Sequence, residues 1–209
     1  MEQEFWLDHW QRGHIPFHRA EVNDLLQKHW AGFGPKHPTV LVPLCGKSVD
    51  MPWIASQGHR VIGIEWAAEA IDEFWQAQGT EPHREPSGAF IASQVDHLTL
   101  LQGDVFAFTA ERLDGPVTVY DRASLVAFNP EQRIAYAQHL SALLQPGDNM
   151  LLITIDYDQT QRAGPPFAVG PALVTSLFAD DFEIEVLDKV RIQGKKIPCW
   201  DLVFSLQKK

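Results

Sequence analysis

The sequence has few cysteines and no long run of basic or apolar residues. Two of its 209 residues are cysteine, fewer than the disulfide framework of a small secreted domain needs. No run of lysine or arginine offsets the formal net charge of -10, which argues against nucleic acid or an anionic membrane as the main partner. No apolar stretch approaches the length of a membrane span, and the acidic start MEQEFW lacks the order of a signal peptide. We therefore expect a cytoplasmic protein that binds neither nucleic acid nor membrane, with a monomer as the default.

Metal ligands and activated nucleophiles are also scarce. The nine histidines and two cysteines show no spacing typical of a zinc site, so we expect no metal ion. The G-x-S-x-G motif of serine hydrolases is absent. Cys45 has no assigned histidine partner, and a structural cysteine in a tight turn explains it better than a nucleophile does.

What the sequence does contain is a regular alternation of strand-like and helix-like segments. The composition, 45% hydrophobic and 21% charged, is ordinary for one globular domain, here residues 1–209. The alternation predicts an α/β fold with a Rossmann-like, mostly parallel sheet of seven strands, helices on both faces and a C-terminal antiparallel hairpin. The predicted strands are Thr39–Leu44, Arg60–Glu65, Leu98–Gln102, Pro116–Tyr120, Asn149–Ile155, Phe182–Leu187 and Pro198–Ser205.

Helical periodicity fills most of the segments between these strands. Residues 1–35 are predicted to form an N-terminal helical cover, which ends at the breaks of Pro35 and Pro38. Residues 80–94 contain Pro82, Pro86 and Gly88 and are predicted to be mostly loop. The predicted helices are Glu4–Arg12, Ala20–Trp30, Val49–Gln57, Ala67–Gln78, Pro130–Leu144 and Pro171–Phe178.

The candidate functional residues directly follow the strands, because open α/β sheets bind ligands at the carboxyl ends of their strands. Glu65 ends the second predicted strand. A carboxylate at that point can accept hydrogen bonds from two ribose hydroxyls, which is typical of nucleoside binding. The alternative is a solvated carboxylate at a strand end.

The turn after the first strand separates two classes of cofactor. A dinucleotide needs G-x-G-x-x-G, which lets the backbone approach a pyrophosphate at a helix N-terminus. This chain has P-L-C-G-K-S, with Gly46 as its only glycine. One point of close backbone approach suits a ligand without phosphate, such as S-adenosylmethionine.

Two other residues, and one pair of residues, each allow two interpretations. Asp104 follows the third strand and either accepts a hydrogen bond from an adenine amino group or is a turn aspartate. Arg122 ends the fourth strand and either pairs with a ligand carboxylate or a polar acceptor, or forms an ion pair with a neighbour. Trp6 and Trp10 lie four residues apart on one helix face, and they are either core residues or a lid over a cationic ligand.

Five motifs occur in a fixed order along the chain. They are W-x-x-x-W with G-x-x-x-F-H (Trp6 to His18), P-L-C-G-K-S (Pro43 to Ser48), G-H-x-V-x-G-x-E (Gly58 to Glu65), D-R-A-S-L-V-A with N-P (Asp121 to Pro130), and Y-D with G-P-P-F (Tyr157 to Phe167). This set resembles the thiopurine S-methyltransferase family, in particular its bacterial form, from about Phe5 to the last strand.

The resemblance implies S-adenosylmethionine as methyl donor and a thiopurine or another aromatic or heterocyclic thiol as acceptor. It also implies selenium or tellurium compounds as acceptors, with a role in tellurite detoxification. Phe17 and Arg122 are expected at the acceptor, while residues 159–163 depart from animal relatives in the loop on the acceptor side. The residues expected at the cofactor are Trp6, Trp10, Phe17, Leu44, Gly46, Glu65, Asp104, Val105 and Arg122.

The expected mechanism is in-line displacement, in which an acceptor sulfur attacks the methyl carbon and S-adenosylhomocysteine leaves. An electron-poor ring lowers the pKa of a thiol below its usual value of about 8.5, so no strong general base is needed. Arg122 is predicted to favour an anionic acceptor electrostatically. Asp156, or else Asp158, is the candidate for assistance with a proton.

Two rival functions use the same fold. A nicotinamide-dependent oxidoreductase predicts a glycine-rich turn, which this chain lacks. A binding protein without catalytic activity would bind the same cofactor but would not convert a thiol acceptor.

Overall fold

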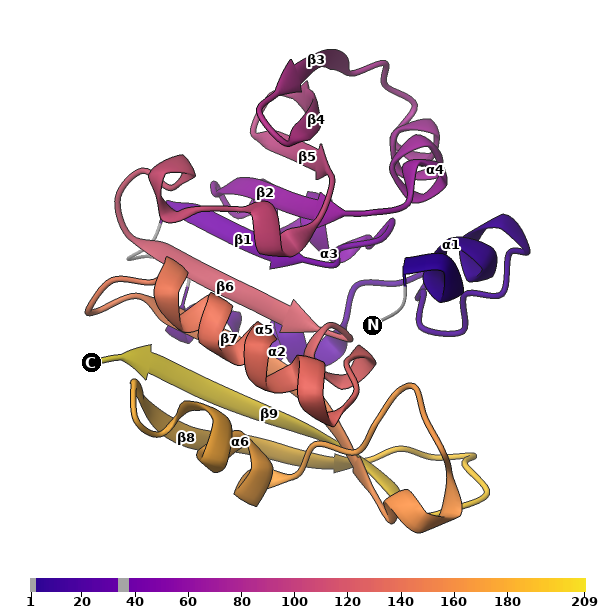
Figure 1. The fold of residues 1–209 in the computed structure, drawn as a ribbon, viewed down its shortest axis with the longest axis vertical. Helices are drawn as coiled ribbons and strands as arrows, with labels where there is room; N and C mark the ends of the chain where they lie inside the picture. Colours follow the sequence, from indigo (N-terminus) through magenta and orange to yellow (C-terminus); the bar gives the residue numbers. More distant parts are fainter. Residues whose placement is uncertain (1–2, 34–37) are drawn as a thin grey trace. The chain divides into compact units, whose positions relative to one another are not determined.

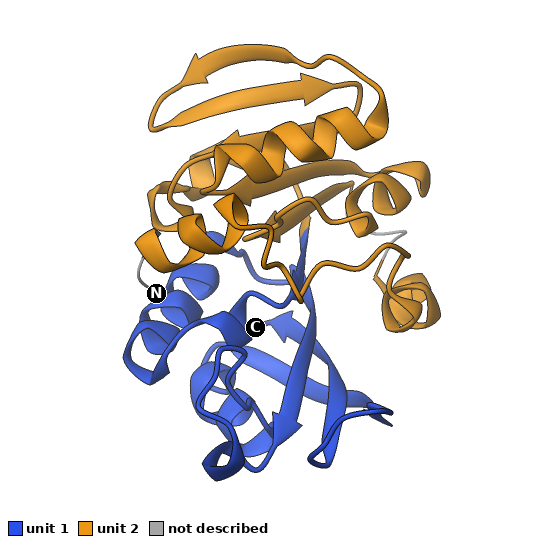
Figure 2. Cartoon of the chain, turned by 90° about the vertical axis from the view of Figure 1, so that its right-hand side faces the viewer, with its two compact units in different colours: residues 1, 118–209 blue, residues 2–117 orange. Residues whose placement is uncertain are grey.

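The computed structural model describes residues 3–33 and 38–209. These residues fall into two units, 2–117 and 118–209 (Figure 2). The prediction of one domain over residues 1–209 stays a prediction, and Pro35, one of the two predicted breaks after the N-terminal cover, lies outside the described residues.

In the unit of residues 2–117, the described residues form five strands in the order β3-β4-β5-β2-β1. The strands β1, β2 and β5 run parallel, and β4 pairs antiparallel with both β5 and β3. β1 is buried throughout, and β2 is buried after its first residue, as the continuous apolar runs predict for strands covered on both faces. The strands are β1 (Thr39–Pro43), β2 (Arg60–Glu65), β3 (His83–Ser87), β4 (Phe90–Val95) and β5 (Leu98–Gln102).

The described residues of this unit form four α-helices: α1 (Gln3–Gln11), α2 (Asp24–His29), α3 (Asp50–Ser56) and α4 (Ala68–Gln78) (Figure 1). α2 is shorter than the predicted helix Ala20–Trp30, because Asn23 caps it. The side-chain oxygen of Asn23 accepts hydrogen bonds from the N–H groups of Leu25 and Leu26, at 2.9 and 3.2 Å. A side chain that caps in this way fixes the first turn of a helix.

The hairpin β3–β4 corrects the prediction that residues 80–94 are mostly loop. Pro86 lies in β3, an edge strand, where its missing N–H costs no hydrogen bond within the sheet. Gly88 and Ala89 form the two-residue turn of this hairpin, because Ser87 pairs with Phe90. The residues that indicate a loop are therefore an edge proline and a turn glycine.

The unit of residues 118–209 carries the strand order β6-β7-β9-β8. β6 (Val117–Arg122) and β7 (Asn149–Tyr157) are parallel. β9 (Cys199–Lys208) pairs antiparallel with both β7 and β8 (Phe182–Arg191). The predicted C-terminal antiparallel hairpin is confirmed.

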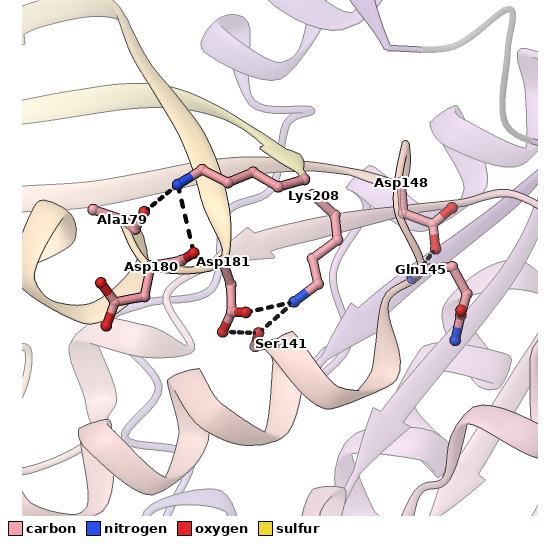
Figure 3. Close-up of polar contacts among 8 residues, drawn as sticks. Ser141, Gln145, Asp148, Ala179, Asp180, Asp181 and Lys208 are labelled. Carbon is pink, nitrogen blue, oxygen red and sulfur yellow. Dashed lines mark hydrogen bonds and ion pairs between the residues drawn. The ribbon is translucent and has the colours of Figure 1, made fainter.

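Two helices, α5 (Pro130–Leu143) and α6 (Pro171–Phe178), complete this unit. The Asn129 side chain caps α5 by accepting a hydrogen bond from the N–H of Gln132 at 2.9 Å. At the end of β9, the Lys208 ammonium contacts Ser141 of α5 at 2.8 Å and the Asp181 carboxylate at 3.1 Å (Figure 3). These contacts fasten the last strand to the helix beside it.

The structure has nine strands over its described residues, where the sequence predicted seven. The two additional strands are those of the β3–β4 hairpin. The other predicted helices and strands occur within a few residues of their expected ends. No helix in the described ranges is both long and apolar enough to cross a membrane.

Candidate active site

The turn after β1 lies beside the end of β2. The parallel register pairs Pro43 with Ile64, so the next residues of both strands reach the same edge of the sheet. There, the backbone N–H of Gly46 donates a hydrogen bond to Oε2 of Glu65 at 2.9 Å. The structure therefore brings together two of the predicted cofactor residues.

The Glu65 carboxylate is buried and accepts three backbone hydrogen bonds. Besides the Gly46 bond, Oε1 accepts from the N–H groups of Trp66 and Ala67 at 2.7 and 2.8 Å. Burial raises the pKa of Glu65 above its ordinary value, and the three N–H donors lower it in part. A carboxylate has about four acceptor positions, and these three bonds leave one of them, on Oε2, for a ligand hydroxyl.

Cys45 sits in the same turn and is buried. Its N–H donates to the carbonyl of Ile64 at 2.9 Å. Burial, and next the charge of Glu65, raise the pKa of the Cys45 thiol well above its ordinary value. A thiol held in the neutral form is a poor nucleophile, which supports the interpretation of Cys45 as a structural residue.

Trp10 of α1 packs directly on this turn. A Cβ added to Gly46 would come within 3.0 Å of Cζ2 of the Trp10 indole, and Gly46 has a φ of +52°. Leu44 also has a positive φ, of +47°. The close approach and the left-handed backbone both explain why glycine occupies position 46.

The aromatic residues of the N-terminal segment form one cluster. Phe17 makes edge-to-face contacts with both Trp6 and Trp10, with ring centroids 5.6 Å apart in each case. Trp10 also packs with Ala67 and Ala70 at the start of α4. The indole Nε1 of Trp6 is buried and has no hydrogen-bond partner among the described residues. The cluster thus has a core role, as one interpretation predicted, and it also presents a buried donor without a partner.

Lys47 is part of this site although sequence reasoning gave it no role. Its Nζ forms an ion pair with Glu73 of α4 at 2.5 Å and lies 6.0 Å from the ring centre of Trp10. It therefore ties the turn after β1 to α4 and to α1. Lys47 stands next to Gly46 in a quoted motif, but no sequence signal pairs it with Glu73.

Asp104 and Val105 lie at the end of β5, next to the end of β2. Gln102 pairs with Glu65, and the N–H of Gly103 donates to the Glu65 carbonyl at 2.9 Å. Oδ1 of Asp104 accepts from the N–H of Phe106 at 3.0 Å and caps the short 3-10 helix η3 (Val105–Ala107). The turn role of Asp104 is thus present, and its role at an adenine stays a prediction.

The predicted residues Arg122 and Asp156 belong to the other unit. Arg122 ends β6 and pairs in register with Ile153 of β7, while Asp156 lies three residues further along β7. The Asp156 carboxylate lies against the backbone of Gly170, where an added Cβ would be 3.2 Å from Oδ1. Both side chains are partly exposed, so both can meet a ligand.

Asp121 has a larger structural role than its position suggested. It is 1% exposed, and its Oδ2 accepts a hydrogen bond from the Tyr136 hydroxyl at 2.8 Å. Its Oδ1 accepts from the N–H of Leu125 at 3.2 Å. Sequence reasoning missed this contact because no local pattern pairs Asp121 with a tyrosine on α5.

The segment after β7 is closed by its own hydrogen bonds. The Tyr157 hydroxyl donates to the Pro166 carbonyl at 2.6 Å. The Gln159 amide donates to the Arg162 carbonyl at 2.6 Å and accepts from the N–H of Ala168 at 2.7 Å. Gln159 lies in the stretch 159–163 that is predicted to lie on the acceptor side, but the sequence did not show that it holds this loop.

Residues 3–33 and 38–209 contain no group of three or more His, Cys, Asp or Glu side chains that could hold a metal ion. The polar groups described above are instead the buried Glu65 carboxylate at the end of β2 and the buried indole N–H of Trp6 in α1. These are groups for an organic ligand with hydroxyl and carboxylate groups.

Comparison with known proteins gives matches over almost the whole chain. The sequence profile of the family Thiopurine S-methyltransferase (TPMT) matches residues 1–198. A thiopurine S-methyltransferase of Pseudomonas fluorescens (strain SBW25) is 46% identical over 196 residues, which cover 93% of this chain and 90% of the relative. A second relative with this name, from Xanthomonas euvesicatoria pv. vesicatoria (strain 85-10), is 44% identical over 90% of this chain and 87% of its own length.

Solved structures share the fold at low sequence identity. The 1,6-didemethyltoxoflavin-N1-methyltransferase of Burkholderia thailandensis, solved with S-adenosylhomocysteine bound, matches with a TM-score of 0.62 at 18% identity, over 99% of this chain and 87% of that chain. The N-methyltransferase NodS of Bradyrhizobium japonicum WM9 matches with a TM-score of 0.63 at 16% identity, over 99% of this chain and 96% of that chain.

The predicted α/β methyltransferase fold is confirmed by these structures, with nine strands in place of seven. The family profile and the relatives confirm the resemblance that five sequence motifs carried, and with it the predicted enzyme class. The roles of the individual site residues stay predictions. The chain belongs to the thiopurine S-methyltransferase family.

Proposed function

We propose that this chain transfers a methyl group from S-adenosylmethionine to the sulfur of thiopurines and of other aromatic or heterocyclic thiols. One observation carries the proposal: the buried Glu65 carboxylate is hydrogen-bonded to Gly46 in a turn that Trp10 covers. A carboxylate there suits a ribose, and a turn with one glycine does not suit a pyrophosphate. Membership of the family supports both the enzyme class and the methyl donor.

The polar groups of the site fit S-adenosylmethionine. The ligand offers ribose hydroxyls as donors and a carboxylate as acceptor. Glu65 supplies charged acceptor oxygens, and the buried indole N–H of Trp6 is a donor without a partner. Because a buried donor without a partner is costly, a ligand acceptor at Trp6 would remove that cost.

In this proposal each predicted cofactor residue has a specific role in binding S-adenosylmethionine. Glu65 holds the ribose, and Leu44 and Gly46 bring the backbone close to the ligand. Asp104 and Val105 flank the adenine, with the Asp104 carboxylate as an acceptor for its amino group. The aromatic side chains of Trp6, Trp10 and Phe17 cover the ligand, and their faces attract its positive charge.

When bound, S-adenosylmethionine supplies a methyl group on a positively charged sulfur. Arg122 favours the anionic form of the acceptor and also contacts the donor, and Phe17 faces the acceptor ring. Alignment of the two reactants is the main contribution, worth up to roughly 7–11 kcal/mol in well-oriented systems. Asp156 can take a proton from an acceptor that arrives as a neutral thiol.

Calorimetric binding of S-adenosylmethionine to wild type, Glu65→Gln and Glu65→Ala tests the proposal. Hydrogen bonds to a charged acceptor contribute about 1.5–3 kcal/mol each, so Glu65→Ala should weaken binding by about ten- to a hundredfold. Unchanged affinity would remove Glu65 from the ribose role.

Turnover and dinucleotide-binding assays distinguish a methyltransferase from the two rival functions, a binding protein without catalytic activity and a nicotinamide-dependent oxidoreductase. Wild type should methylate a thiopurine, which a binding protein on the same fold would not do. Titration with a nicotinamide dinucleotide should show no binding, since the turn lacks the second and third glycines. A normal methyl-transfer rate in Arg122→Ala would defeat the role of Arg122 at the reaction centre.

The proposal extends to selenium and tellurium compounds as acceptors and to tellurite detoxification, on the family resemblance alone. A methyl-transfer screen over thiols, selenols and tellurium compounds tests it by ranking kcat/KM. A cytoplasmic location, a monomeric state and the absence of nucleic-acid partners also stay predictions.

A further inference from the structure

Asp121 lies one residue before Arg122 and is enclosed by donors. Besides the Tyr136 hydroxyl and the Leu125 N–H, the N–H and the hydroxyl of Ser124 also hydrogen-bond to its carboxylate. Donors thus come from α5 and from the turn that follows β6. With 1% exposure, Asp121 cannot meet a ligand itself.

The turn that these bonds hold is strained. Ala123, between Arg122 and Ser124, has a φ of +69°. This left-handed conformation is unfavourable for a residue with a Cβ and persists only where the surroundings enforce it. The bonds from Ser124 and Leu125 to Asp121 close the turn around Ala123 and so enforce it.

The far side of the turn is also fastened. The short 3-10 helix η5 (Leu125–Ala127) follows directly, and the carbonyl of Val126 accepts a hydrogen bond from the N–H of Phe167 at 2.7 Å. The carbonyl of Phe128 accepts from the Arg133 guanidinium at 3.0 Å. Arg122 therefore stands at the start of a segment whose course is fixed at each end.

We propose that Asp121 is a positioning residue for Arg122: its buried carboxylate, clamped by Tyr136, holds the Arg122–Leu125 turn so that the guanidinium is presented at the carboxyl end of β6. Arg122 makes the contact with the reactants, and Asp121 acts only through it. This inference rests on the proposed function, because Arg122 has its role there.

The ring of Tyr136 has a separate packing role. It stacks on Phe128 with ring centroids 4.5 Å apart and an interplanar angle of 29°. Tyr136→Phe therefore removes the hydroxyl bond to Asp121 and keeps the stack. It is the milder of two ways to loosen the turn, and it keeps the test open where Asp121→Ala does not fold.

A double-mutant cycle for methyl transfer to a thiopurine tests the inference, with Asp121→Ala, Arg122→Ala and the double variant. Loss of hydrogen bonds to a charged group should lower kcat/KM of Asp121→Ala by about tenfold or more. In the Arg122→Ala background the same change should cost little further, because residues that act through one group are not additive. Asp121→Asn keeps the shape and an acceptor oxygen and should recover most of the lost kcat/KM.

Asp148 offers the matched control in the same unit. It is also buried, at 5% exposure, and its Oδ2 accepts from the N–H of Gln145 at 2.8 Å (Figure 3). Asp148→Ala should lower the unfolding midpoint but leave kcat/KM unchanged. A role of Asp121 in stability alone would give the Asp148 result.

Two results would overturn the inference. One is an equal fold-loss from Asp121→Ala, or from Tyr136→Phe where the alanine variant does not fold, in the wild-type and Arg122→Ala backgrounds. The other is an unchanged rate at which phenylglyoxal labels Arg122 in the Asp121 and Tyr136 variants. Mass spectrometry measures this rate, and the measurement needs no turnover. The labelling rate of Arg122 should rise in Asp121→Ala or Tyr136→Phe and stay at the wild-type value in Asp148→Ala.

An unchanged Arg122 labelling rate in the Asp121 and Tyr136 variants overturns the positioning role whatever the activity. A wild type that fails to methylate any thiol overturns the proposed function instead, and labelling then decides the positioning role alone. The two failures are therefore distinguishable.

Discussion

The Glu65 carboxylate accepts a hydrogen bond from the backbone N–H of Gly46 at 2.9 Å, across 19 residues of sequence. The contact joins the ends of β1 and β2, and Trp10 packs on the same glycine. Two features therefore disfavour any residue other than glycine at position 46: the left-handed backbone and the Trp10 indole that packs on it.

Gly46→Ala should lose both stability and cofactor affinity. A left-handed φ costs an L-residue about 1–2 kcal/mol, and the new Cβ would meet Trp10 at 3.0 Å. Gly79→Ala is the control, because Gly79 has a φ of +65° and nothing lies within 4 Å of an added Cβ. Chemical denaturation should show a loss in both variants, and calorimetry with S-adenosylmethionine a loss in Gly46→Ala alone. Equal affinities would show that the Trp10 contact does not shape the ligand site.

Trp6→Phe should weaken binding of S-adenosylmethionine without lowering stability beyond the packing loss of the smaller ring. The indole N–H of Trp6 is buried without a partner in residues 3–33 and 38–209, and a ligand acceptor would satisfy it. A neutral hydrogen bond contributes about 0.5–1.5 kcal/mol, so the dissociation constant should rise by about two- to tenfold.

Trp30→Phe is the matched control for Trp6→Phe. The Trp30 indole N–H is also buried without a partner in the described part of the chain, but its ring packs on Phe33, Trp53 and His59. Calorimetry should find wild-type affinity for S-adenosylmethionine in this variant. An equal weakening in both variants would indicate a general effect of tryptophan loss and refute a ligand contact at Trp6.

Local pattern predicted those elements whose ends carry their own signals. β2 occupies Arg60–Glu65 and α6 occupies Pro171–Phe178, with the predicted ends. An apolar run bounded by polar residues defines the first, and a proline in the first turn defines the start of the second. Part of the candidate site could also be predicted from the sequence. The carboxyl ends of parallel strands lie at one edge of a sheet, whichever long-range contacts the strands make.

Long-range pairing could not be predicted in the same way. The β3–β4 hairpin was missed because Pro86 and Gly88 indicate a loop unless the strand is known to be at an edge. The bonds between Tyr136 and Asp121 and between Lys47 and Glu73 join separate elements. Such contacts depend on how helices pack, and local sequence does not encode that packing.

The pH dependence of stability should change in Asp121→Asn. Burial raises the pKa of Asp121 from 3.8 to about 6, against the lowering effect of its donors. The folded state therefore keeps a proton on Asp121 between these values where the unfolded state has lost it, so the group's contribution is full below pH 3.8 and declines as pH rises to about 6. The unfolding free energy of Asp121→Asn, relative to wild type, should rise by up to about 3 kcal/mol between pH 4 and 7.

Urea denaturation at several pH values measures this difference, and Asp158→Asn provides a control of opposite sign. Hydrogen bonds from Gln161 and Thr160 lower the pKa of Asp158, so its contribution is present above its unfolded pKa and declines as pH falls. The stability of Asp158→Asn relative to wild type should therefore fall as pH rises. A pH-independent difference for Asp121→Asn would mean that Asp121 titrates alike in both states.

Gln159→Ala should raise the KM for the thiol acceptor and leave the affinity for S-adenosylmethionine unchanged. The Gln159 side chain bridges the Arg162 carbonyl and the Ala168 N–H, so its loss should loosen the loop that is predicted to lie on the acceptor side. If the loosening costs the acceptor as much as one neutral hydrogen bond, about 0.5–1.5 kcal/mol, KM should rise by about two- to tenfold. Gln161→Ala is the control, because Gln161 donates only to the exposed Asp158 at 2.8 Å and spans no loop. If both variants keep the wild-type KM, the loop does not shape the acceptor site, and acceptor preference must be set elsewhere.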